Sequence, residues 1–319
     1  MERGNETVVT EFILRGFPTF IHLQVVLFLV FLLAYIFTII ENMVIILMIR
    51  MNQKLHKPMY FFLSNLSFLE IWYITVTIPN LLVNILTEKK SISFSGCMTQ
   101  LFFFISLMCT ECVLLAVMAF DCYVAICYPL RYPTIMSNQL CIQLAALAWI
   151  SGFAITVIKI SFISRLTFCG PNVINHFFCD ISPVLNLACT DMSLAEEVDF
   201  ILALVVLLIP LTATVVSYIA IVAAILKIPS NTGRKKAFST CASHLTVVTT
   251  FYSATLYIYA RPKKINAFDI NKLISVLYAV ITPIVNPIIY CLRNKEVIGV
   301  LRNSGYCNLI FSRKVENAK

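Results

Sequence analysis

The sequence has little charge and little glycine. Of its 319 residues, 13% are charged and 60% are hydrophobic, and the mean hydropathy is +0.88. A soluble globular domain is about 25% charged, so this chain has too few charges to cover a soluble surface of its size. Its eight glycines are never closer than six residues apart, which excludes a glycine-rich nucleotide loop. Disorder, collagen, a coiled coil and a small disulfide scaffold are excluded as well, and we expect the chain to lie in a bilayer.

Long apolar runs are present instead. A helix needs about 20 apolar residues to cross about 30 Å of hydrocarbon. Strand-like alternation and internal repeats are absent, which argues against an outer-membrane barrel and against many transporters. The sequence therefore predicts an all-α membrane protein, a seven-transmembrane helix bundle with a short amphipathic cytoplasmic helix after the seventh span. The predicted spans are Leu23–Ile49, Pro58–Leu86, Gln100–Cys127, Leu140–Ile163, Val198–Leu226, Ala237–Tyr259 and Leu273–Leu292.

The positive charges predict the orientation of the bundle. Lysine and arginine gather before the second span, before the sixth span and in the C-terminal tail, so the positive-inside bias favours a cytoplasmic C-terminus. Residues 1–22 then form an extracellular N-terminus, 23–292 the transmembrane domain and 293–319 a cytoplasmic tail with a membrane-surface helix. Asn5, in an Asn-Glu-Thr sequon, is a predicted glycosylation site. No cleavable signal peptide is expected before the first span.

Cysteine is plentiful, and four of the 12 cysteines fall on the predicted outer side. An even number in an oxidising compartment predicts two disulfides among Cys97, Cys169, Cys179 and Cys189, with three possible pairings. No CxxC or CxxH pair favours zinc. HExxH and GxSxG motifs are also absent, so we expect neither an enzyme nor a cofactor. Cys307, in the basic tail, is a candidate for palmitoylation.

Acidic side chains inside the spans are a further lead, because a charge in a bilayer is costly unless it has a partner. Glu41, Glu70 and Glu111 lie well inside the first three spans. One interpretation of Glu70 with Glu111 is an intramembrane cation or proton site. The alternative is a neutral, hydrogen-bonded cluster that only fixes helix packing.

Five motifs occur in order along the chain, each near one end of a predicted span. They are Pro58-Met-Tyr-Phe-Phe-Leu63, Met118-Ala-Phe-Asp-Cys-Tyr-Val-Ala-Ile-Cys127, Ser217-Tyr218, Lys236-Ala-Phe-Ser-Thr-Cys-Ala-Ser-His244 and Pro283-Ile-Val-Asn-Pro-Ile-Ile-Tyr290. Together they strongly resemble the odorant (olfactory) receptors, a branch of the rhodopsin-like (class A) G-protein-coupled receptors. The resemblance covers nearly the whole chain.

The resemblance implies a multi-pass protein of the plasma membrane that contacts lipids, a small-molecule odorant and a heterotrimeric G protein of the Gs/olfactory type, but no nucleic acid. It also implies the disulfides Cys97–Cys179 and Cys169–Cys189. The odorant would be mostly apolar and neutral, because Phe104 occupies the position at which amine receptors hold an acid. The implied ligand-binding residues are Phe104, Ile105, Met108, Leu202, Val206, Tyr252, Thr255, Leu256, Tyr259, Val276 and Ala279. The implied coupling and activation residues are Asp121, Cys122, Tyr123, Tyr218, Asn286, Pro287 and Tyr290.

One departure from the family pattern bears on function. The family motif Asp-Arg-Tyr is Asp121-Cys122-Tyr123 here, and a thiol supplies neither the charge nor the paired donors of a guanidinium. Two other functions therefore stay open beside an odorant receptor that raises cyclic AMP. One is a receptor that binds odorant but couples weakly, and the other is an ion-coupled transporter that uses Glu70 and Glu111.

Overall fold

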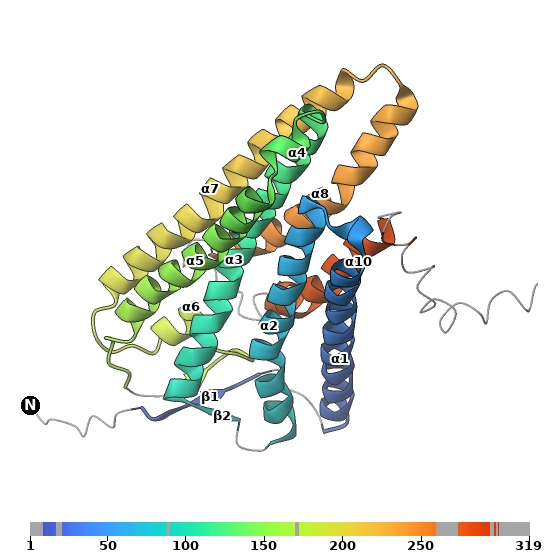
Figure 1. The fold of residues 1–319 in the computed structure, drawn as a ribbon. Coiled ribbons are helices and arrows are strands. Elements are labelled where there is room, and N and C mark those ends of the chain that lie inside the picture. Colours follow the sequence, from blue (N-terminus) through green and yellow to red (C-terminus); the bar gives the residue numbers. More distant parts are fainter. Residues whose placement is uncertain are drawn as a thin grey trace, which may run out of the picture.

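The protein is described by a computed structural model, which describes residues 9–16, 21–87, 90–169, 172–259 and 274–293, and residues 297 and 299. Its long helices run side by side (Figure 1). They are α1 (Ile21–Met51), α2 (Pro58–Leu86), α3 (Phe94–Cys127), α5 (Asn138–Ile163), α7 (Ser193–Leu226), α8 (Asn231–Tyr259) and α10 (Thr282–Arg293), which follows the π-helix η2 (Leu277–Ile281).

Five of these helices, α1, α2, α3, α5 and α7, are long and apolar enough to cross a membrane, and residues 274–290 form a shorter apolar helix. Helices α3, α7 and α8 begin before the predicted starts of their spans, at Phe94, Ser193 and Asn231. Polar first turns explain the difference, because they extend a helix beyond the apolar run that a hydropathy search detects. Ser93, for example, caps α3 by accepting a hydrogen bond from the Gly96 backbone at 3.1 Å.

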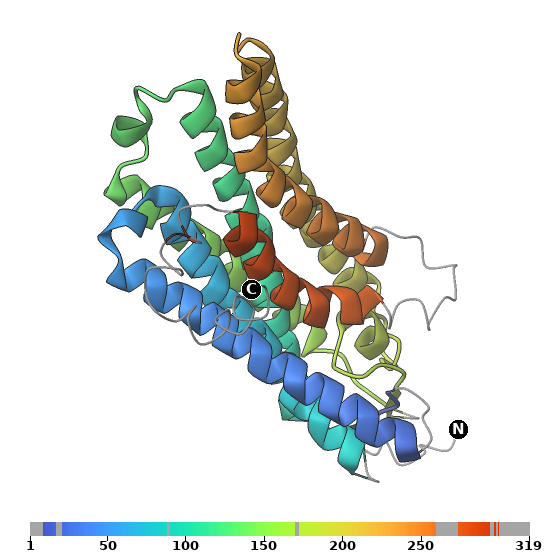
Figure 2. The ribbon, with the colours of Figure 1, turned by 90° about the vertical axis from the view of Figure 1, so that its right-hand side faces the viewer.

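Helix α3 lies at the centre of the bundle, where it contacts α2, α5, α7 and α8 (Figures 1 and 2). In its most apolar stretch 78% of the residues are buried, compared with 11% in α1. Large apolar side chains of α1 are exposed, among them Leu33 and Ile40. An exposed apolar face of this kind fits contact with lipid.

A small sheet closes one end of the bundle, which we call the sheet end. Strand β1 (Glu11–Leu14) pairs antiparallel with β2 (Ser91–Ser93) and parallel with β3 (Val173–Ile174). Short helix α6 (Ile181–Leu185) lies in the connection between α5 and α7. Two disulfides fix this connection: Cys97–Cys179, with Cα atoms 5.6 Å apart, and Cys169–Cys189, at 5.8 Å. This is the pairing that the resemblance implies.

The opposite end, which we call the far end, carries short helix α4 (Tyr132–Ile135) and the turn between α7 and α8 (Figure 1). The 3-10 helix η1 (Gln53–Leu55) joins α1 to α2. Of the predicted tail, Arg293, Val297 and Gly299 are among the described residues, and all three are helical. Asn5 and Cys307 lie outside the described residues, so their predicted modifications stay predictions.

Candidate ligand pocket and coupling end

Near the sheet end, the predicted ligand-binding residues of α3 form a buried aromatic and aliphatic face. Phe104 and Ile105 are fully buried and Met108 nearly so. The Phe104 ring centroid lies 5.1 Å from that of Tyr73 on α2 and 4.7 Å from that of Phe178 in the α5–α7 connection. Aromatic side chains therefore fill the part of the predicted pocket that α3 lines in this conformation.

The other predicted pocket residues lie on neighbouring helices. On α7, Val206 is buried and Leu202 half-buried. On α8, the Tyr252 hydroxyl donates to the Cys112 carbonyl of α3 at 3.0 Å, and Thr255 donates to the Phe251 carbonyl of its own helix. Leu256 and Val276 are half-buried, Ala279 is fully buried, and the side chain of Tyr259 lies outside the described residues. The Tyr252 hydroxyl thus binds the backbone of α3 and does not face a cavity.

The α5–α7 connection covers this face from the sheet end. His176 lies 3.2 Å from the Ser275 hydroxyl, through its Nε2 atom, beside the aromatic rings of Phe177 and Phe178. The Cys179 backbone donates to the Gln100 side chain of α3 at 3.0 Å. The Cys97–Cys179 disulfide, the packed aromatic rings and these polar contacts together hold the connection against the sheet end of the bundle.

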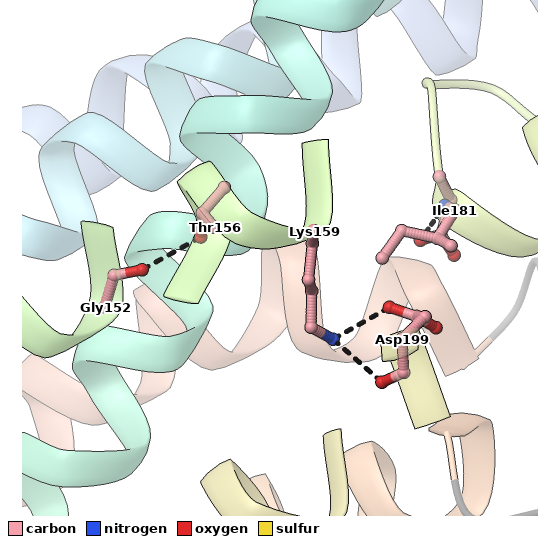
Figure 3. Close-up of polar contacts among 6 residues, drawn as sticks. Gly152, Thr156, Lys159, Ile181 and Asp199 are labelled. Carbon is pink, nitrogen blue, oxygen red and sulfur yellow. Dashed lines mark hydrogen bonds and ion pairs between the residues drawn. The ribbon is translucent and has the colours of Figure 1, made fainter. Parts of the chain in front are cut away.

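A buried ion pair borders the same region, and the sequence reasoning missed it. Lys159 of α5 points at Asp199 of α7, and its Nζ atom lies 2.8 Å from the Asp199 carboxylate (Figure 3). It also donates to the Asp199 backbone oxygen at 3.3 Å. The side chains are 3% and 19% exposed, so the pair is largely removed from solvent. A lysine inside an apolar span was the available signal, but its partner lies 40 residues away.

At mid-depth the structure brings Glu70 and Asn286 together. The Asn286 Nδ2 atom donates to Glu70 Oε1 at 2.6 Å, and both side chains are buried. Glu111 is buried within electrostatic range of Glu70. Within the described part of the chain, Glu70 Oε2 and Glu111 Oε1 have no hydrogen-bond partner.

This polar cluster is not a preformed multidentate metal site. In the described ranges no group of three or more His, Cys, Asp or Glu side chains is close enough to hold a metal. Two buried carboxyl oxygens in this cluster therefore have no hydrogen-bond partner among the described residues.

At the far end, three helices are tied together through Tyr218 and His244. The Tyr218 hydroxyl on α7 lies 2.7 Å from His244 Nδ1 on α8 and donates to the Cys241 carbonyl at 3.3 Å. His244 Nε2 in turn lies 3.1 Å from the Leu115 carbonyl of α3. Tyr290 of α10 completes the group, its ring centroid 6.5 Å from that of His244, one turn beyond Pro287.

The Asp121-Cys122-Tyr123 motif lies beside this network. Asp121 accepts a hydrogen bond from the Tyr132 hydroxyl of α4 at 2.8 Å. Burial and the neighbouring Asp121 carboxylate raise the pKa of the Tyr132 phenol, so it stays a donor. Cys122 is buried against Cys241 of α8, while the half-buried Tyr123 packs at the rim of the same cluster. The Asp121 carboxylate therefore pairs with a tyrosine hydroxyl.

Comparison with known proteins decides the family. The olfactory receptor family model matches residues 31–304. The chain belongs to the olfactory receptor family. It is 63% identical over 307 residues to olfactory receptor 6B1 of Homo sapiens, covering 96% of this chain and 98% of that receptor. It is 61% identical over 309 residues to olfactory receptor 226 of Rattus norvegicus, covering 95% and 94%.

Olfactory receptors are class A G-protein-coupled receptors, so this olfactory receptor is a multi-pass membrane protein and not an enzyme. Odorant recognition and G-protein coupling in general follow from the family. The resemblance seen in the five sequence motifs is confirmed.

Proposed function

We propose that this receptor binds small, mostly apolar and neutral odorants at the sheet end and activates a Gs-type olfactory G protein at the far end, which raises cyclic AMP. The observation that carries the proposal is the contrast between the two ends of α3. Its sheet-end half presents Phe104, Ile105 and Met108 to a closed apolar interior. Toward the far end, its Leu115 carbonyl contacts His244 of α8, which in turn contacts Tyr218 of α7, and these few hydrogen bonds can be exchanged.

The orientation is part of the proposal. Disulfides form and persist in oxidising compartments, which supports an extracellular sheet end. Basic residues at the opposite end support a cytoplasmic far end. The N-terminus is then extracellular, where Asn5 would carry a glycan, and the receptor lies in the plasma membrane.

The mechanism is a shift between two arrangements of the same bundle. An odorant that fits between α3, α7 and α8 stabilises the arrangement in which it has most contact, and the Tyr252 bond to the Cys112 carbonyl must adjust to admit it. Because α8 carries both Tyr252 and His244, a change at the pocket is transmitted along one rigid helix to the far end. There the Tyr218–His244 contacts open and the G protein enters.

We assign the cluster around Glu70 and Glu111 to a proton or a monovalent cation that is held more tightly in the closed arrangement. Two buried carboxyl oxygens without partners support this assignment. Glu111→Gln should then shift the balance toward the open arrangement and raise signalling without odorant.

Cys122 favours a second, closely related outcome, in which coupling is weaker than in a receptor with arginine at this position. The thiol is only 7% exposed and faces α8 rather than the cytoplasm. Cys122→Arg would supply the paired donors that the thiol lacks. A larger cyclic AMP response in that variant, at equal surface expression, is the expected result.

The experiment that tests the proposed function uses a matched pair of substitutions on α7. Val206 is buried and faces the bundle, whereas Val205 is 42% exposed on the outer face of the same helix. Cells with equal surface expression are screened with an odorant panel for cyclic AMP. We expect Val206→Ala to change which odorants act or their potency, and Val205→Ala to behave as the parent. Equal odorant profiles for all three proteins would contradict the placement of the pocket.

A further inference from the structure

Two free cysteines lie against each other where α3, α7 and α8 meet. Cys122 of α3 and Cys241 of α8 form a small buried cluster with Ile221 and Ile225 of α7, separate from the main core of the bundle. The two side chains are 7% and 4% exposed and belong to the same small cluster.

This thiol pair lies near the far end but not at its surface. Cys122 precedes the end of α3 at Cys127 by about one and a half turns, and Cys241 follows the start of α8 at Asn231 by about three turns. A small, uncharged reagent can reach this depth, whereas a folded enzyme or a bulky charged thiol cannot. The pair joins α3 to α8 directly beside Tyr218, whose contacts with His244 open, under the proposed function, to admit the G protein.

We propose that Cys122 and Cys241 are a site of oxidation by peroxides, and that the disulfide they form covalently closes α3 on α8. The disulfide itself is independent of the proposed function, but its effect on signalling rests on that function. Cys122 occupies the position at which the family motif has arginine, so the pair places a redox-sensitive contact at that position.

The chemistry balances with one peroxide for each pair of thiols. One sulfur, as its thiolate, attacks the O–O bond of hydrogen peroxide and becomes a sulfenic acid, and one water leaves. The second thiol attacks the sulfenic sulfur, which forms the S–S bond and releases a second water. Two thiols lose two protons and two electrons in total, and both oxygens of the peroxide are reduced to water. Dithiothreitol reverses the step by thiol–disulfide exchange.

The order of cysteines along the chain makes the bond directly measurable. Both native disulfides join residues on the N-terminal side of the α7–α8 turn, whereas Cys241 lies on the C-terminal side. A protease sequence inserted in this turn, between Ile228 and Asn231, therefore cuts the full-length receptor into two fragments that no native disulfide connects. Any covalent connection between the fragments then reports a new bond across the cut.

The receptor in lipid nanodiscs is treated with hydrogen peroxide, cut, and run on a non-reducing gel. We expect the two fragments to stay linked, to separate after dithiothreitol, and to separate without it in Cys122→Ser and Cys241→Ser. Cys127→Ser is the matched control, because its thiol donates to the Ala220 carbonyl at 3.7 Å and lies on the same turn region of α3. It should link as the parent does. Separation of the parent fragments after peroxide, or a link that survives in Cys122→Ser, overturns the proposal.

Signalling is measured separately, so that the two claims fail separately. In cells that respond to an odorant, peroxide should abolish the cyclic AMP response of the parent receptor and of Cys127→Ser, and dithiothreitol should restore it. Cys122→Arg, which cannot form the bond, should keep its response under peroxide. Linked fragments together with an undiminished response would overturn the closing role of the bond while leaving the oxidation site in place.

Discussion

Replacement of Gly152 by alanine should separate α3 from α5 and destabilise the bundle. A Cβ atom at Gly152 would lie 2.7 Å from the Ser106 backbone oxygen and 2.9 Å from the Thr110 backbone nitrogen, and it would collide with the Thr110 hydroxyl. Ordinary contacts of this kind begin near 3.4 Å. Backbone atoms cannot move aside as a flexible side chain can, so the two helices must move apart by about 0.5–1 Å.

The net free energy of unfolding follows from two opposing effects. Overpacking of a closely packed site costs about 1–3 kcal/mol. Alanine is favoured over glycine inside a helix by about 1 kcal/mol, which offsets part of this cost. Because the contacts are with backbone, we expect the upper part of the range and a net loss of about 1–2 kcal/mol, with a midpoint of thermal unfolding lower by about 2–6 °C.

Free cysteines supply the assay. Cys109, Cys112 and Cys141 are buried and free, so a maleimide dye that fluoresces on reaction with thiols reports their exposure as the receptor unfolds in detergent. Ala154→Val is the control, because Ala154 is exposed on the same helix and the added methyl groups meet no packed neighbour. A Gly152→Ala receptor that melts at or above the parent's midpoint would refute the close approach of the two helices.

Three further predictions test the polar contacts. Lys159→Met should lower the free energy of unfolding by about 3–5 kcal/mol, because it leaves a largely buried carboxylate unpaired, and the added change Asp199→Leu should restore most of it in the same melting assay. Tyr218→Phe removes a hydroxyl that joins α7 to α8 in the closed arrangement, and this contact contributes about 1 kcal/mol. The cyclic AMP level without odorant should therefore rise by up to about fivefold. An unchanged basal level would contradict a role of this contact in holding the closed arrangement. Asn286→Ala should cost about 1.5–3 kcal/mol, whereas Glu70→Gln, which keeps an acceptor for Asn286, should cost less than half as much; equal losses would contradict the observed hydrogen bond.

Much of this architecture could be predicted from the sequence, because a bilayer imposes one simple requirement on each span. Leu66, Leu107 and Leu207 lie on the helices α2, α3 and α7 and inside predicted spans, because apolar length alone identifies the core of each helix. Glu70 and Asn286 both lie inside predicted spans, and a hydrogen bond joins them in the structure. Depth can be counted along a helix, so contacts at one level of the bundle are partly predictable.

Helix rotation and loop structure could not be read in the same way. The Lys159–Asp199 pair depends on which faces α5 and α7 present to each other, and their sequences do not determine this rotation separately. Strand β1 has four residues, with no clear alternation, and its pairing with β2 and β3 depends on where the disulfide-bonded connection lies. The His244 contacts join three helices, so the sequence of any one helix does not predict them.

The most direct test of the central claim is nucleotide exchange on a purified Gs heterotrimer by this receptor in lipid nanodiscs. An odorant chosen from the cell panel should accelerate exchange on Gs, should have little effect on a Gi heterotrimer, and should act more strongly with the Cys122→Arg receptor. Binding of that odorant to both receptors with no acceleration of Gs exchange by either would contradict the claim that the sheet-end pocket controls a Gs-coupling far end.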